Sequence, residues 1–315
     1  MTSRTADVPG ADAGSAVPVS AGTRRVLIAN VVAQVGIVVT GGLVRLTGSG
    51  LGCPTWPECT DGSLVPTAGQ AEGTQSLIEF GNRLLTLVLV VVAIAALVAV
   101  LRHRPRRRPL VVLAALVLAG IPAQAVLGGV TVLVDLHPAA VAAHFLLSMA
   151  VIAAAVVLLN RSGEAGDGPA TPTVRGELRS LAWVISVVAV TVLVLGTVVT
   201  GSGPHAGDEA SPRFGFDVRA ASWLHADVVI LLVGLTVAFW LGCRLTGAPR
   251  SPQRAAVWLL LACVAQGAVG YTQYFTGVPV ALVSLHVLGA CLVWVATVTL
   301  LLSTRRHPAG GFGSG

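Results

Sequence analysis

The chain has 315 residues, of which 54% are hydrophobic and only 11% are charged. Its mean hydropathy of +0.83 is too high for a soluble domain of this length, so the composition indicates an integral membrane protein. The net charge of +6 does not indicate a nucleic-acid-binding protein, because the basic residues are all arginines that gather in particular segments between apolar runs.

Eight apolar runs are long enough to cross the hydrocarbon core of a bilayer, which takes about 20 residues of helix. They cover residues 26–46, 76–101, 110–134, 139–159, 181–201, 221–243, 255–275 and 280–303. Residues 1–25 are rich in Ala, Gly, Ser and Pro, and we expect them to be disordered. Residues 304–315 are expected to form a short tail.

The arginines predict how the chain is oriented in the membrane. They concentrate before the first run, in RHRPRRR (102–108), between the fourth and fifth runs, between the sixth and seventh, and after the eighth. Segments rich in arginine stay on the cytoplasmic side of a membrane. We therefore expect a multi-pass protein of the cell membrane with both termini in the cytoplasm.

A cysteine pair lies in the first long outer segment, in the sequence CPTWPEC (53–59). That segment is expected to face an oxidising compartment, where disulfides form and persist. We therefore predict a disulfide between Cys53 and Cys59, and the sequence leaves open whether it is a structural bond or a redox-active one.

The second half of the chain repeats the first. AQAVLGGVT (123–131) aligns with AQGAVGYTQ (265–273), and the same offset of 142 residues places His144 on His286. The runs ending in LTGSG (46–50) and VTGSG (199–203) also correspond. The repeat predicts an all-α membrane protein whose eight transmembrane helices form two pseudo-symmetric four-helix bundles. The expected divisions are 26–160 for the first bundle, 161–180 for a cytoplasmic linker and 181–303 for the second bundle.

Three histidines lie inside the runs, at similar depths and on alternate helices: His144, His225 and His286. At about 1.5 Å per residue, each lies within roughly 10 Å of the outer surface. Facing histidines in an apolar bundle are a common way to hold haem. Zinc is the rival, but the outer half lacks the further ligands at local spacing that a closed zinc site needs.

The repeat also predicts that the two sites differ. His225 and His286 belong to one half and could hold one iron from both sides, which suits electron transfer. In the other half, His144 is opposite Asn82, and asparagine is a poor iron ligand, so this haem would have an open face suited to chemistry. Gln124 and Gln266 are expected to hydrogen-bond near the same sites.

Glu79 lies one turn from Asn82, and it has Arg83 as an i,i+4 partner. One interpretation is an ion pair near the start of a helix. The other is a partly buried carboxylate that accepts a proton or positions water beside a substrate. Arg45 and Arg83 depart from the positive-inside pattern, and haem propionates would explain them, because arginine pairs with carboxylates.

These residues together resemble the haem A synthases of the CtaA/Cox15 family. The resemblance rests on GGLVRLTGSGLGCPTWPEC (41–59), the E-x-x-N-R of residues 79–83, HPAAVAAHFLLS (137–148), VVTGSGPHAGD (198–208) and the two C-terminal histidines. It covers about residues 26–303.

Membership of this family would imply oxidation of the C8 methyl group of haem O to the formyl group of haem A, for cytochrome oxidase assembly. It would imply a permanent haem B on His225 and His286, haem O as the substrate on His144, and an essential carboxylate at Glu79. The expected partners are membrane lipid, an electron acceptor and the farnesyltransferase that makes haem O. Association with further copies of the chain stays open.

Two features depart from the family pattern. Many members have histidine where this chain has Asn82, which leaves the second axial ligand of the substrate haem open. The third outer segment, 201–218, lacks the cysteine pair that some bacterial members have. Two functions of other classes remain: a di-haem electron-transfer protein linked to quinol, and a haem carrier that delivers haem through Cys53 and Cys59.

Overall fold

A computed structural model describes residues 19–308. Eight helices run through this range, and each is long and apolar enough to cross a membrane. They are α1 (Ala21–Leu46), α2 (Thr74–Arg102), α3 (Arg108–Leu133), α4 (Pro138–Ser162), α5 (Gly176–Ser202), α6 (Val218–Leu245), α7 (Arg250–Phe275) and α8 (Val280–Ser303). The prediction of eight membrane-spanning helices from the apolar runs is therefore confirmed.

Most helices extend beyond the apolar runs that predicted them, chiefly at the end where the chain termini lie. For example, α5 begins at Gly176, and α7 begins at Arg250. An apolar run marks only the part within hydrocarbon, whereas backbone hydrogen bonding continues into the polar interface. Likewise, α1 begins at Ala21, inside the segment expected to be disordered; residues 1–18 of that segment, and 309–315 of the tail, lie outside the described residues.

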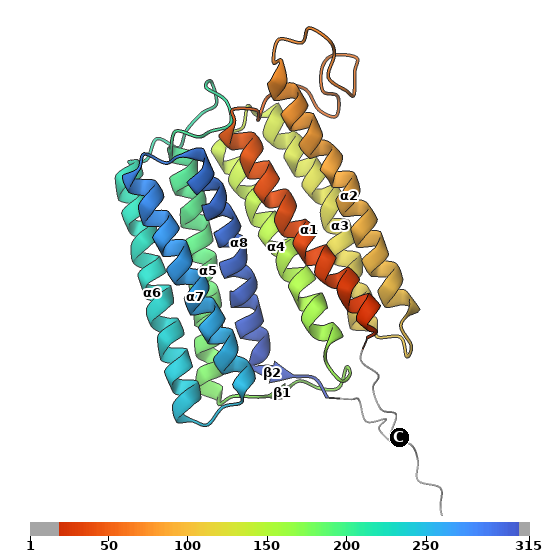
Figure 1. Ribbon diagram of the computed structural model, residues 1–315, viewed down its shortest axis with the longest axis vertical. Helices are drawn as coiled ribbons and strands as arrows, with labels where there is room; N and C mark the ends of the chain where they lie inside the picture. The colour runs from red at the N-terminus through yellow and green to blue at the C-terminus, as the bar shows by residue number, and fades with distance from the viewer. Residues whose placement is uncertain (1–18, 309–315) are drawn as a thin grey trace, which may run out of the picture.

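The helices form two bundles that lie side by side (Figure 1). In the first, α1 and α3 each pack against both α2 and α4; in the second, α5 and α7 each pack against both α6 and α8. The bundles meet where α4 contacts α5 and α8, and where α1 contacts α8. The order of neighbours is thus the same in both halves, as the repeat predicts, while a two-fold symmetry relating them stays a prediction.

The densest apolar packing lies at the end of each bundle nearest the chain termini. In the second bundle, Ile185, Phe239, Leu259 and Leu300 are fully buried against one another. Leu27, Val100, Leu110 and Leu158 have the same place in the first bundle. Because these clusters fill that half of each bundle, the opposite half is where polar groups from different helices can meet.

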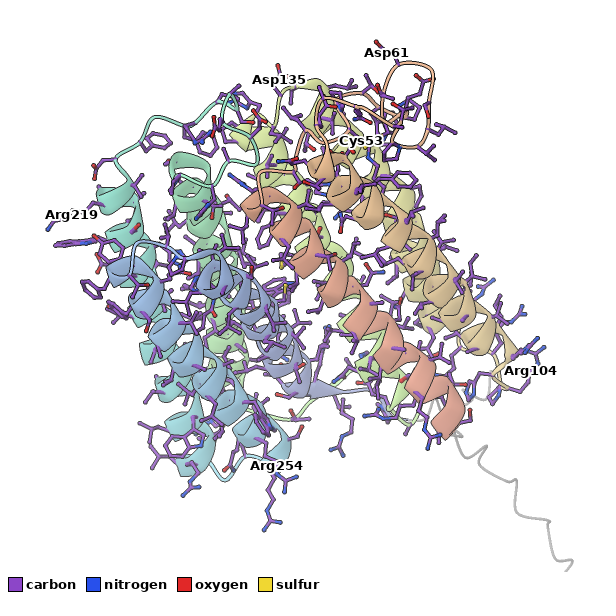
Figure 2. All side chains as sticks on the ribbon, turned by 45° about the horizontal axis from the view of Figure 1, so that its top comes forward. Cys53, Asp61, Arg104, Asp135, Arg219 and Arg254 are labelled. Carbon is purple, nitrogen blue, oxygen red and sulfur yellow. A yellow bond between two sulfur atoms is a disulfide. The ribbon has the colours of Figure 1, made fainter. Side chains whose placement is uncertain are left out.

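The arginine-rich segments lie together at one end of the molecule. Arg104 and Arg254 are at this end, and Asp61 and Asp135 are at the other (Figure 2). Two short strands also lie at the arginine-rich end, where β1 (Thr171–Pro172) pairs antiparallel with β2 (Arg305–Arg306). The linker between the bundles is thereby joined to the end of the described chain.

A charged cluster holds the linker against the first bundle. Arg107 donates hydrogen bonds to Asp167 at 2.8 Å and to the carbonyl oxygen of Gly166. Arg161 donates to the same carboxylate oxygen at 3.2 Å.

One hydrogen bond joins the two bundles within their apolar contact. The indole N–H of Trp294 in α8 donates to the carbonyl oxygen of Met149 in α4 at 2.8 Å.

Candidate functional site

His225 and His286 meet across the middle of the second bundle. His225 comes from α6 and His286 from α8, and these two helices lie diagonally because each packs against α5 and α7. The ring centroids are 6.4 Å apart, and the ring planes meet at 62°. The Nδ1 atom of each ring is buried, and it has no hydrogen-bond partner among the described residues.

The spacing of this pair fits an iron held between two imidazoles. Imidazole nitrogens bind metals at about 2.0 Å, so two rings on opposite sides of one metal atom have centroids roughly 6 to 6.5 Å apart. A closed zinc site would need four ligands. Within residues 19–308, no three His, Cys, Asp or Glu side chains gather closely enough to hold a metal. The geometry therefore favours haem over zinc.

The two predicted glutamines, Gln124 and Gln266, each hydrogen-bond to the backbone of the helix that carries a histidine. Gln266 in α7 donates its amide to the carbonyl oxygen of His286 at 2.7 Å. Gln124 in α3 makes the corresponding bond to His144 at 3.3 Å, and it also donates to Ser148 Oγ at 2.6 Å. Buried amide bonds of this kind fix the relative height of neighbouring helices, so they set the height of each histidine in its bundle.

Asn82 is held by a residue that the sequence did not single out. Thr40 Oγ1 in α1 donates a hydrogen bond to Asn82 Oδ1 at 2.7 Å. Both side chains line a cavity of about 310 Å³ between α1 and α2, whose other walls include Leu43, Ile78 and Leu85. The cavity is therefore largely apolar, with one amide at its side.

Glu79 is buried, with 7% of its surface exposed, and both of its carboxylate oxygens are engaged. Oε1 accepts hydrogen bonds from Arg83 at 2.7 and 3.1 Å. Oε2 accepts a bond from the backbone N–H of Cys53 at 2.7 Å. The ion pair is therefore present, while a role for Glu79 in proton transfer stays a prediction.

Arg83 holds the same outer loop by its carbonyl oxygens. It donates to the carbonyls of Cys53 and Thr55, both at 3.2 Å, and of Glu58 at 3.1 Å. Cys53 and Cys59 are fully buried and form the predicted disulfide. Glu79 and Arg83 together thus fasten the CPTWPEC loop to α2, which occupies the guanidinium that we expected to meet a propionate.

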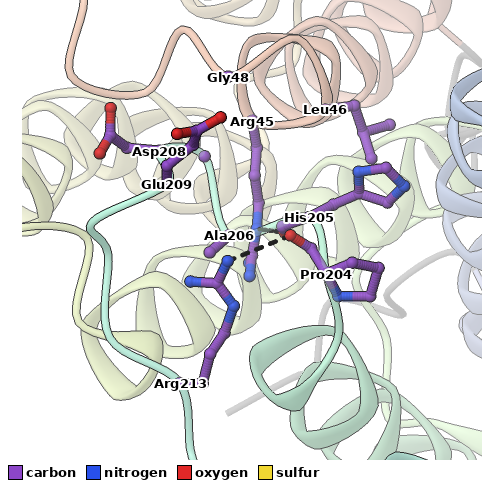
Figure 3. A pocket seen from close by; sticks show the side chains of 10 residues that line it. Arg45, Leu46, Gly48, Pro204, His205, Ala206, Asp208, Glu209 and Arg213 are labelled. Carbon is purple, nitrogen blue, oxygen red and sulfur yellow. Dashed lines mark hydrogen bonds between the residues drawn. The ribbon is translucent and has the colours of Figure 1, made fainter.

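Arg45 joins the two halves at the outer end. It donates to the carbonyl oxygens of His205 at 2.7 Å and Thr200 at 3.1 Å, both in the second half of the chain. Arg213 lies beside it in the α5–α6 loop and donates to the carbonyl oxygen of Pro204 (Figure 3). Both arginines line a cavity of about 330 Å³, together with Asp208 and other residues of that loop.

Neither Arg45 nor Arg213 has a carboxylate within 4.0 Å among residues 19–308. Arg45 is among the residues predicted from the sequence, whereas Arg213 is not. The signal was available, because an arginine in an outer segment departs from the positive-inside pattern just as Arg45 does.

The fold and the site together define a multi-pass membrane protein with two four-helix bundles and with histidines that face one another in at least one of them. Residues 24–298 match the COX15-CtaA family, whose description is cytochrome oxidase assembly protein. The match covers most of the chain, so this protein belongs to that family.

Curated relatives agree with this assignment. The chain is 27% identical over 279 residues to the "Heme A synthase" of Halalkalibacterium halodurans, which covers 85% of this chain and 89% of the relative. It is 28% identical over 263 residues to that of Symbiobacterium thermophilum, covering 78% and 84%. A segment of 132 residues is 35% identical to that of Lysinibacillus sphaericus, covering 42% of each chain.

Proposed function

We propose that this protein is a haem A synthase, which oxidises the C8 methyl group of haem O to the formyl group of haem A. The family and the names of the relatives support this activity. The observation that carries it is the difference between the two halves of the chain. In the second half, the ring centroids of His225 and His286 are 6.4 Å apart, so the two rings could ligate one haem iron from both sides. In the first half, α2 carries Asn82 at the position where α6 carries His225, so a haem there would keep one side of its iron free.

In the second bundle, His225 and His286 would hold a permanent haem B. The spacing of their rings supports this role. A haem with two imidazole ligands supplies a redox centre that passes single electrons. The protein's own part is to keep both rings in place through Gln266 and the neighbouring helices, and to surround them with apolar side chains.

In the first bundle, His144 would bind the iron of haem O as the substrate. Asn82 would face the other side of that haem from α2, where its amide is oriented by Thr40. An amide side chain can donate or accept a hydrogen bond but is a weak ligand for iron. The free face would therefore remain accessible.

Glu79 would act at the reacting edge of the substrate, one turn outward from Asn82 on the same helix. We assign it the role of accepting a proton or positioning water beside the methyl group. Arg83 and the N–H of Cys53 would fix the direction of its carboxylate. The disulfide loop that these bonds hold would cover the outer side of the site and limit the entry of bulk water.

Arg45 and Arg213 would receive haem propionates at the outer seam between the bundles. Asp208 and Glu209 also line this cavity, but neither pairs with Arg45 or Arg213 within 4.0 Å. The two guanidinium groups can therefore bind carboxylates of a ligand through paired hydrogen bonds. Arg45 lies one turn outward from Gly41, which contacts Asn82. The cavity is therefore near the outer edge of the proposed substrate site.

The arginine-rich end of the molecule would face the cytoplasm, with both termini on that side of the cell membrane. Haem O would arrive from the membrane-bound farnesyltransferase that makes it, and an electron acceptor would remove the electrons released by oxidation.

The test is to express the protein with a haem O synthase, extract the haem and separate it by reversed-phase chromatography. Haem A should appear only when the protein is present, and Glu79→Gln should abolish it while haem binding persists. Unconverted haem O, together with bound haem B, would refute the synthase and leave the di-haem electron-transfer function. In His225→Ala and His286→Ala, the low-spin spectrum of bound haem B should disappear.

A further inference from the structure

Each histidine of the second bundle has the Cε1 edge of its ring against a glycine of the preceding helix. A β-carbon placed on Gly270 in α7 would lie 3.1 Å from Cε1 of His286 in α8. A β-carbon placed on Gly196 in α5 would lie 3.4 Å from Cε1 of His225 in α6. At Gly270 an added methyl group would crowd the imidazole, because 3.1 Å is shorter than most contacts of a β-carbon, whereas at Gly196 it would reach ordinary van der Waals distance.

The first bundle repeats the arrangement. A β-carbon on Gly128 in α3 would lie 3.2 Å from Cε1 of His144 in α4. A β-carbon on Gly41 in α1 would lie 3.8 Å from Nδ2 of Asn82 in α2. The glycine contact therefore occurs in the four helix pairs α1–α2, α3–α4, α5–α6 and α7–α8, and in the first of these asparagine takes the place of histidine.

General helix packing does not account for this pattern. Glycines do let membrane helices approach closely, and others in this chain have that role: a β-carbon on Gly120 would lie 2.6 Å from the side chain of Val151. Other helix glycines contact nothing, because a β-carbon on Gly267 would meet no atom within 4 Å. The four glycines described above instead contact a proposed site residue, which is a histidine in three cases and Asn82 in the fourth.

The glycines also limit the rotation of the histidine rings, which hydrogen bonds usually do. A histidine ring turns easily about its χ2 angle, and a ligating histidine normally fixes this angle by donating its second N–H to a carbonyl or carboxylate. In His144 and His286 the Nδ1 atom is buried without such a partner among residues 19–308, whereas the backbone of Val192 lies near the ring of His225. The direction of the His144 and His286 rings is therefore fixed by packing, and the glycine is a close surface on the Cε1 edge of each.

We propose that Gly128 and Gly270 are positioning residues that set the ring orientation of the haem-ligating His144 and His286, and that Gly196 and Gly41 keep the equivalent places for His225 and Asn82. The inference rests on the proposed haem sites. The angle between two axial imidazoles influences the energies of the iron orbitals, so these glycines tune the spectrum and potential of the haem without touching the iron.

The test compares Gly270→Ala with Gly267→Ala, which adds the same methyl group to the same helix one turn away. Both variants gain the same helix propensity, so a general effect of alanine appears in both. The protein is purified with its haem, and the haem-to-protein ratio, the low-spin electron paramagnetic resonance spectrum and the midpoint potential are measured.

We expect Gly267→Ala to match the wild type, and Gly270→Ala to shift the low-spin resonance and the midpoint potential. Gly128→Ala, with a contact of 3.2 Å to His144, should likewise shift the absorption spectrum of haem O bound in the first bundle, and it decides the matter if Gly270→Ala does not fold. Gly196→Ala should give little shift, because 3.4 Å is an ordinary contact distance. If Gly270→Ala has the spectrum and potential of Gly267→Ala, or if Gly128→Ala leaves the haem O spectrum unchanged, the positioning role is wrong. A wild type without low-spin haem would instead refute the haem sites themselves.

Discussion

The contact between Glu79 and the disulfide loop leads to a quantitative prediction. Glu79 accepts one bond from the N–H of Cys53 and two from Arg83. In Glu79→Ala, the N–H of Cys53 loses its acceptor and Arg83 loses its counterion, although Arg83 keeps its bonds to the loop carbonyls. In Glu79→Gln, the amide oxygen can still accept from Cys53, but the amide NH2 group then faces Arg83, so the charge and the Arg83 bonds are lost while the Cys53 bond is kept.

The size of the effect follows from these bonds. A hydrogen bond to a charged group contributes about 1.5–3 kcal/mol. We therefore expect Glu79→Ala to lower the free energy needed to open the loop by about 2–3 kcal/mol. This is less than the cost of breaking a fully buried ion pair, because Arg83 keeps its bonds to the loop carbonyls. Since 1.4 kcal/mol is a factor of ten, the open population should rise roughly 30- to 150-fold. Glu79→Gln should show a smaller rise.

The assay is the rate at which a small thiol reduces the Cys53–Cys59 disulfide in the native protein. Both sulfur-bearing residues are fully buried, so reduction requires the loop to open, and its rate follows the open population when reclosing is fast. Asp61→Asn is the control, because it removes an exposed carboxylate from the same loop. If Glu79→Ala is reduced no faster than Asp61→Asn, the loop is not held by Glu79.

Two further predictions concern the substrate side and the linker. Asn82→His should give the haem of the first bundle a second imidazole ligand and increase the low-spin absorbance of protein loaded with haem O. Gly81→Ala is the control, and if Asn82→His has the same spectrum as this control, residue 82 does not face the iron. Desolvation raises the pKa of Asp167, but the bonds and charges of Arg107 and Arg161 outweigh it and hold that pKa below its ordinary value of 3.8. This stabilisation is present above that value and is lost as pH falls through the lower, folded-state pKa. The difference in thermal unfolding midpoint between wild type and Asp167→Asn should therefore be constant near neutral pH and shrink below about pH 4; an equal difference at pH 7 and pH 3 would contradict it.

The sequence by itself determined the helices, because crossing a membrane requires a long apolar run with all backbone groups bonded within it. It also predicted that His144, His225 and His286 stand at one depth, because the rise along a helix is constant. The disulfide followed from two cysteines six residues apart in a segment expected outside the cytoplasm.

Only the tertiary structure decided which side chains meet. The bond between Thr40 and Asn82 joins residues 42 apart, and that between Arg45 and His205 joins residues 160 apart. Such contacts depend on how each helix is rotated about its axis and on which helix is its neighbour, and apolar runs carry little of that information because lipid accepts an apolar side chain on any face. The glycine behind each histidine became recognisable only when two helices were placed against each other.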